Sequence, residues 1–98
     1  MALDNEDRAY LEKIIDGIIN EVPAIMKMVR TEEYKKFVQY KDEGDVVLAL
    51  ATGIIHGRFA EYFVTRQQRA PNPDEVSESN QVIYRRVREI KEAIFKCG

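Results

Sequence analysis

The segment from Val46 to Arg69 constrains the fold of this chain more than any other. Its residues follow the period of an α-helix, but two stripes of that helix are apolar instead of one. The narrow stripe holds mostly small side chains: Ala49, Gly53, Gly57, Ala60 and Val64. The other stripe is bulky: Leu48, Ile55, Phe59 and Tyr62. A helix that is apolar on two sides is typical of a central helix, so we expect neighbours on both sides of it.

The narrow stripe predicts a close helix–helix contact. Each glycine within a helix costs about 1 kcal/mol relative to alanine, and a close neighbouring backbone offsets that cost. The spacing is similar to that of contacts between membrane helices, but Arg58, Glu61 and Arg66 exclude a bilayer setting. His56, the only histidine in the chain, flanks the stripe. Because no nucleophile or carboxylate stands near it on the helix, we interpret it as structural or interfacial.

The periodicity also predicts the helices on either side. A first helix runs from about residue 5 to 22, where Pro23 ends or kinks it. A second covers roughly residues 24–43, with a break near Thr31 as the alternative. Gly44 and Asp45 have the residue types of a helix end and a helix cap. They predict a tight antiparallel hairpin between the second helix and the third.

A linker at about residues 70–74 precedes the last helix. Asn72 and Pro73 fit its cap and first turn, and the helix then runs to about Lys96. A heptad-like seam lies along it: Val76, Asn80, Ile83, Val87, Ile90, Ile94 and Cys97. We expect this seam to pack on the protein's own helices or on an antiparallel partner. The sequence thus predicts a single all-α domain, 1–98, as a four-helix bundle-like arrangement on a central hairpin, or five helices with a break at Thr31.

Composition restricts the setting. The chain has 98 residues, a net charge of −2 and one cysteine, Cys97. Its acidic start does not have the basic-then-apolar order of a secretory signal, and its longest apolar run is too short to span a bilayer. A lone cysteine cannot form an internal disulfide, and a reducing, cytoplasmic location is expected.

Carboxylates gather at Asp42, Glu43 and Asp45. The run from Asp42 to Val47 resembles the E-x-G-D-V-L metal motif of the all-α nucleotide pyrophosphohydrolases. That resemblance implies a magnesium site, but aspartate stands in place of the first glutamate, and the family's upstream E-x-x-E is missing from residues 1–41. Half of the motif leaves too few carboxylates for Mg²⁺. We therefore interpret these residues as a polar turn with helix caps, and we predict no metal or cofactor.

A second resemblance rests on Gly44-Asp45, Ala49-Leu50-Ala51 and His56-Gly57. The pattern is similar to an archaeal helical-hairpin family of unknown function, whose turn reads G-D-x-x-x-A-L-A. It covers about residues 37–61, a quarter of the chain. The resemblance implies a hairpin and no activity.

Basic residues gather in the second half of the chain. Residues 51–98 hold 8 basic and 6 acidic groups, against 7 and 11 in residues 1–50. The candidates for phosphate contact are Arg66, Arg69, Arg85, Arg86 and Arg88. On the last helix these arginines are spaced for i,i+4 pairs with Glu89 and Glu92, which favours a solvated surface over a nucleic-acid site.

These patterns favour a non-enzymatic helical interaction module, a homodimeric adaptor or accessory subunit. The chain has more apolar helix surface than three neighbours cover, so self-association is expected. The predicted interface comprises Ala49, Gly53, His56, Gly57, Ala60 and Val64. The alternatives are a nucleic-acid-binding accessory protein and a diverged nucleotide pyrophosphohydrolase.

Overall fold

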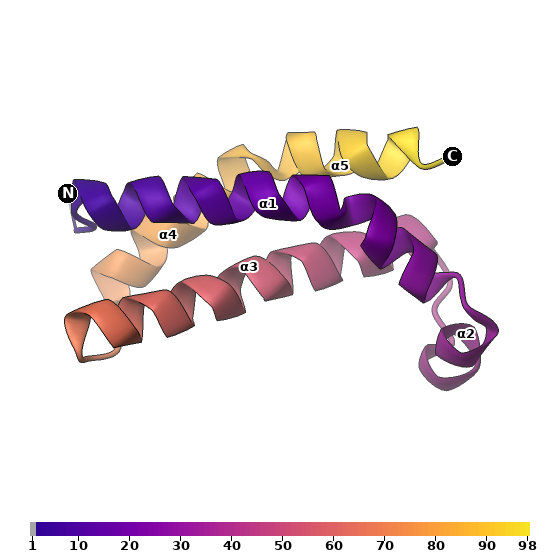
Figure 1. Ribbon diagram of the computed structural model, residues 1–98, viewed down its shortest axis with the longest axis horizontal. Coiled ribbons are helices and arrows are strands. Elements are labelled where there is room, and N and C mark those ends of the chain that lie inside the picture. Colours follow the sequence, from indigo (N-terminus) through magenta and orange to yellow (C-terminus); the bar gives the residue numbers. More distant parts are fainter. Residues whose placement is uncertain (1) are drawn as a thin grey trace.

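A computed structural model describes residues 2–98, which hold five helices and no strand. The helices are α1 (Asn5–Val29), α2 (Glu32–Val38), α3 (Glu43–Gln67), α4 (Pro73–Arg85) and α5 (Val87–Lys96). Figure 1 shows α1 and α3 as two long antiparallel rods, with α4 and α5 following one another along α1 as a third, broken rod. The prediction of an all-α bundle-like fold is confirmed.

Pro23 does not end the first helix. Asp4 caps α1, its side chain accepting from the Asp7 amide at 2.8 Å. The helix then continues through Pro23 and bends toward α3 in its last turns (Figure 1). Beyond the proline, Ile25, Met26 and Val29 are buried. Their burial maintains the helix despite the hydrogen bond that proline removes. The predicted end at Val22 is therefore wrong, and the alternative, a kink at Pro23, is what the structure has.

The predicted second helix over residues 24–43 is also wrong, because the break at Thr31 makes the next helix short. Thr31 caps α2, its hydroxyl accepting from the Tyr34 amide at 3.2 Å. Gln39 ends α2 in the left-handed conformation, with φ 53°. Asp42 caps α3 in place of Asp45, and Gly44 lies within its first turn instead of ending a helix. The long hairpin is therefore formed by α1 and α3, with α2 inserted in the connection.

α3 lies at the side of the bundle and not in its middle. A single buried ridge runs along it at four-residue steps: Val47, Ala51, Ile55, Phe59 and Phe63. This ridge packs against α1 and α5. The bulky stripe predicted for this helix thus corresponds partly to its buried face, with Leu48 and Tyr62 half-buried beside it.

The last helix begins as predicted and then breaks. Asn72 and Glu75 form a reciprocal capping box, and Pro73 occupies the first turn of α4. The helix is interrupted at Arg86, whose φ is −103° and ψ 4°, so the predicted continuous helix to Lys96 is wrong. From Ile83 onward the heptad-like seam packs on the protein's own α1 and α3, with Ile83 and Ile90 buried. Val76, nearer the start, is 44% exposed.

Arg86 connects the break in the third rod to α1. Its guanidinium donates to Glu12 Oε1 at 3.0 Å and to the Glu12 carbonyl at 3.2 Å. It also donates to Asp16 Oδ1 at 2.6 Å and to both carboxylate oxygens of Glu89. These contacts raise the pKa of Arg86, with the hydrogen bond to Glu89 as the largest cause. The side chain therefore joins α4, α5 and α1 at one point.

We expect Arg86→Ala to lower the free energy of unfolding by about 2 kcal/mol, because it leaves three carboxylates without their shared cation. For a domain of this size the midpoint of thermal unfolding should fall by about 10 °C. Arg85→Ala is the matched control, since Arg85 is exposed and its removal should change stability by less than about 0.5 kcal/mol. Equal thermal midpoints for the two variants would contradict the role given to Arg86.

Candidate interaction surfaces

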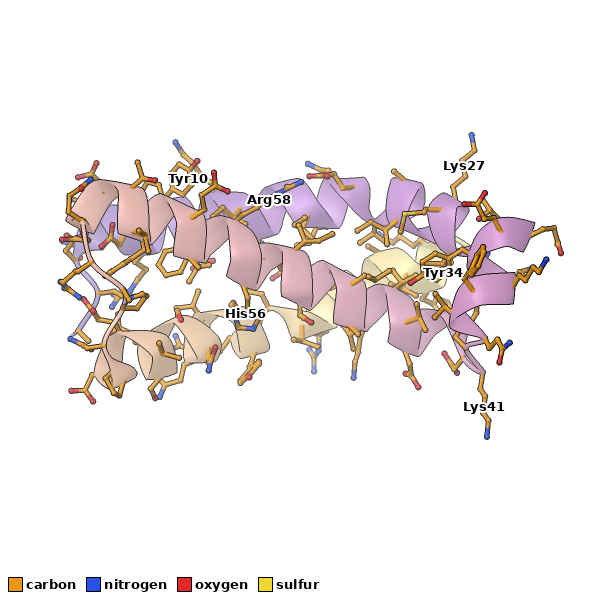
Figure 2. The ribbon with its side chains drawn as sticks, turned by 90° about the horizontal axis from the view of Figure 1, so that it is seen from below. Tyr10, Lys27, Tyr34, Lys41, His56 and Arg58 are labelled. Carbon is orange, nitrogen blue, oxygen red and sulfur yellow. The ribbon has the colours of Figure 1, made fainter. Side chains whose placement is uncertain are left out.

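The outer edge of α3, formed by the predicted interface residues Ala49, Gly53, Gly57, Ala60 and Val64, is exposed along its length. Figure 2 looks onto this side of α3, with His56 and Arg58 on opposite flanks of the helix. His56 is exposed, and Arg58 pairs with Glu21 of α1 at 2.8 Å. No helix within residues 2–98 covers the edge, so the prediction that α3 has neighbours on two sides is wrong.

The two glycines of this edge have no explanation inside the bundle. A Cβ built on Gly53 or Gly57 meets nothing within 4 Å among the described residues. The predicted close approach of another helix is therefore absent within residues 2–98. Each glycine lowers the stability of the helix and gains no packing contact in return.

Side-chain size along the outer edge reads nearly the same from both ends. Half-buried Val46 extends the edge by one turn toward the start of α3. Counted from the ends inward, valine is followed by alanine and then glycine: Val46 and Val64, Ala49 and Ala60, Gly53 and Gly57. The centre of this order falls near Ile55.

Three of the five arginines proposed for phosphate contact are already paired. Arg66 contacts Asp4, Glu6 and buried Asp7, and Arg69 contacts Glu75 at 2.7 Å. Arg86 forms the junction described above. The ion pairs of Arg66 raise the pKa of its guanidinium above the ordinary value, and the hydrogen bond to Asp4 is the largest cause. Charges neutralised in this way are poor ligands for phosphate, because binding would first have to break the ion pair.

The remaining two candidates for phosphate contact, Arg85 and Arg88, do not line the same surface. Arg85 borders a shallow depression that it shares with Glu12 and Glu78, whereas Arg88 lies on the outer side of α5 beside Lys91 and Phe95. The predicted i,i+4 pairs of the last helix are not seen among residues 2–98. Glu89 instead pairs with Arg86, three residues before it.

The acidic turn is occupied by structural contacts. Asp42 accepts from the Asp45 amide at 2.9 Å as the cap of α3. Glu43 pairs with Arg30 at 2.6 Å, and this hydrogen bond lowers the pKa of the Glu43 carboxyl. Within residues 2–98 no three histidine, cysteine or acidic side chains converge as metal ligands. The turn therefore has the geometry of helix caps and an ion pair.

Sequence periodicity did not reveal a tyrosine pair between α1 and α3. The rings of Tyr10 and Tyr62 stack with centroids 3.7 Å apart and planes 3° apart. They border an open groove together with Ile14, Arg58 and Arg66. Both arginines are held by carboxylates, so the groove presents apolar ring surface without a free cation.

Length and composition alone would allow one helix in residues 2–98, α3, to cross a membrane. One such helix is weak evidence, because helices that supply a protein core share the property. Here the buried ridge of α3 supplies part of the core.

Comparison with protein-family models gives no match. Comparisons with curated proteins and with solved structures also give none. The two resemblances drawn from the sequence therefore stay predictions, and proposals about function rest on the surfaces described above.

Glu75 should contribute a pH-dependent part of the stability. Its carboxylate accepts from Arg69 at 2.7 and 2.9 Å and from the Asn72 amide at 2.8 Å, and it is 5% exposed. The hydrogen bond from Arg69 is the largest cause that lowers its pKa below the ordinary 4.5. A carboxyl whose pKa is lower in the folded state stabilises the fold above the pKa of the unfolded chain, and this contribution is lost as the pH falls through the folded-state pKa.

We expect Glu75→Gln to lower the free energy of unfolding at pH 7 and to reduce its decline between about pH 5 and pH 3. Urea unfolding at several pH values measures both effects. Asp74→Asn is the matched control, because Asp74 is an exposed acid in the same first turn. A decline in Glu75→Gln as steep as that of Asp74→Asn would show that Glu75 contributes nothing to the pH dependence.

Proposed function

We propose that this chain is a non-enzymatic helical interaction module that acts as a homodimer, with the outer edge of α3 as the contact between protomers. A second protein that docks on the assembled dimer would make it an adaptor or accessory subunit. The observation that carries the proposal is the pair of exposed glycines, Gly53 and Gly57, in the middle of a 25-residue helix.

The glycines support an external contact through their cost. Two glycines within a helix together cost about 2 kcal/mol relative to alanine, and nothing in the bundle requires their lack of a side chain. A helix from another molecule can approach a glycine surface closely, so that backbone and side-chain atoms on both sides come into van der Waals contact. Such a contact offsets the cost only when the second molecule is present.

The outer side of α3 is also unlike the outer sides of the other rods. α1 exposes Lys13, Asp16, Asn20 and Lys27 beside Met28, and α5 exposes Arg88, Lys91 and Glu92 beside Phe95. Between its flanks, α3 exposes only small apolar residues from Ala49 to Val64. An apolar strip with polar flanks is typical of a protein–protein interface.

The two alternative functions have weaker support. An enzymatic role as a diverged pyrophosphohydrolase needs free carboxylates, but Asp42 caps α3 and Glu43 pairs with Arg30. A nucleic-acid role needs free cations on one face, and carboxylates already hold Arg66, Arg69 and Arg86. We therefore rank both below self-association.

We expect Gly53→Leu and Gly57→Leu to have opposite effects on the monomer and on the dimer. Each exposed site accepts a side chain without a clash, and leucine favours the helix over glycine by about 0.8 kcal/mol, so the monomer should become slightly more stable. The added side chains separate the facing backbones, so the dimer dissociation constant should rise at least about tenfold. Sedimentation equilibrium measures the dimer, and urea unfolding at low protein concentration measures the monomer.

Gly17→Leu is the matched control for this pair. Gly17 lies within α1, and a Cβ there also meets nothing within 4 Å. This variant should gain helix stability without losing self-association. The proposal fails if the unaltered chain sediments as a monomer at high micromolar concentration, or if all three variants dimerise equally.

A further inference from the structure

Two features that the proposed homodimer does not use are the symmetric order of side-chain size along the outer edge and the position of α2. α2 stands outside the bundle and has no buried residue. Its Phe37 is 78% exposed, and Val38 is 46% exposed. Figure 1 shows α2 projecting at the start of α3, on the side away from α5, which is the side of the outer edge.

We infer that the partner on the outer edge is a second copy in the antiparallel direction, with a two-fold axis near Ile55 and with α2 of each protomer against the far end of its partner's α3. This inference rests on the proposed homodimer and adds its direction, its register and a second contact.

The order of side-chain size fixes the point at which the two helices cross. A two-fold axis near Ile55 places each position opposite the one equally far from the centre on the other copy. Gly53 then faces the partner's Gly57, and Val46 faces the partner's Val64. Ala49 lies six residues from Ile55 and Ala60 five, so these two alanines face one another to within one residue. The backbones can approach most closely at the crossing point, where both helices carry glycine, and the separation grows outward as the side chains enlarge. An isologous interface needs this kind of self-complementarity.

The position of α2 favours the antiparallel direction over the parallel one. In a parallel pair both copies of α2 would project from the same end toward each other, in the space next to the start of both helices (Figure 1). In the antiparallel pair each α2 lies at the opposite end. It can then contact the last turns of the partner's α3, where exposed Val64 ends the outer edge. The helix dipoles of the two α3 rods also oppose one another in this direction.

Area requires the second contact. From Val46 to Val64 the edge is about 27 Å long at 1.5 Å per residue. With a width of about 10 Å it offers about 270 Å² per protomer, which is about a third of the 800 Å² in a stable interface. α2 carries exposed apolar surface at the place where it can add to this area. Phe37 is the larger of its two exposed apolar side chains, and it would bury the most apolar surface against a partner.

Disulfide cross-linking between two cysteine variants tests the direction. Ala49→Cys and Ala60→Cys are each made in a Cys97→Ser background, one of them with a size tag, and are mixed under mild oxidation. A disulfide needs Cα atoms within about 7 Å. In the antiparallel register, the mixture should give a tagged–untagged product, and each variant alone should give at least about tenfold less. Val46→Cys with Val64→Cys repeats the test at the ends of the edge.

Sedimentation of the same variants separates the two proposals. A dimer in which each variant alone cross-links as well as the mixture would overturn the antiparallel register and retain the α3 contact. A dimer that gives no cross-link with any of the variants would place the interface elsewhere and overturn both proposals. Sedimentation of the unaltered chain as a monomer removes the homodimer itself.

The contact with α2 has its own measurement. Phe37→Ala should raise the dimer dissociation constant about tenfold and change monomer stability little, because the Phe37 side chain is 78% exposed in the monomer. Phe95→Ala is the matched control, since Phe95 is 86% exposed but lies on the outer side of α5. Equal dissociation constants for the two variants would overturn the assignment of α2 to the interface.

Discussion

The antiparallel contact between α1 and α3 is the interaction on which the rest of the fold depends. Each helix contributes one continuous row of buried apolar residues, and these rows include Leu11, Ile15 and Ile18 on α1 and Ile55 and Phe63 on α3. α4 and α5 cover only one side of this pair. The pair must therefore be formed for the third rod to bury Ile83 and Ile90, and Arg86 then fixes the position of that rod against α1 through Glu12 and Asp16.

Local signals predicted two of the helix starts correctly and the helix pairing incorrectly. Thr31 and Asn72 lie at helix starts as the sequence predicted, because a cap needs only the residue and the two or three that follow it. Asp42 takes the place of the predicted Asp45 at the start of α3. The effect of Pro23 depends instead on distant residues. The burial of Ile25 and Val29 against the rest of the bundle outweighs the missing hydrogen bond, and no local pattern reports that burial.

The surface was predicted in part. Periodicity located the small-residue stripe of α3 correctly, but it could not tell an interior stripe from an exterior one. Both consist of small apolar residues, and the difference lies in what packs against Gly53 and Gly57. The ion pairs of Arg66 and Arg69 could not be predicted either, since their partners Asp4, Asp7 and Glu75 meet them only after the helices have packed.

A three-rod bundle necessarily leaves one side of every rod in water, and the composition of each exposed side is informative. α1 and α5 place mostly charged residues there, together with the exposed side chains of Met28 and Phe95. α3 combines a buried ridge of mostly large residues with an exposed edge of small ones. A helix that only had to stay soluble would place lysine or glutamate at positions 53 and 57, with a gain in helix stability. The two glycines give up that stability at the positions where a facing backbone would come closest.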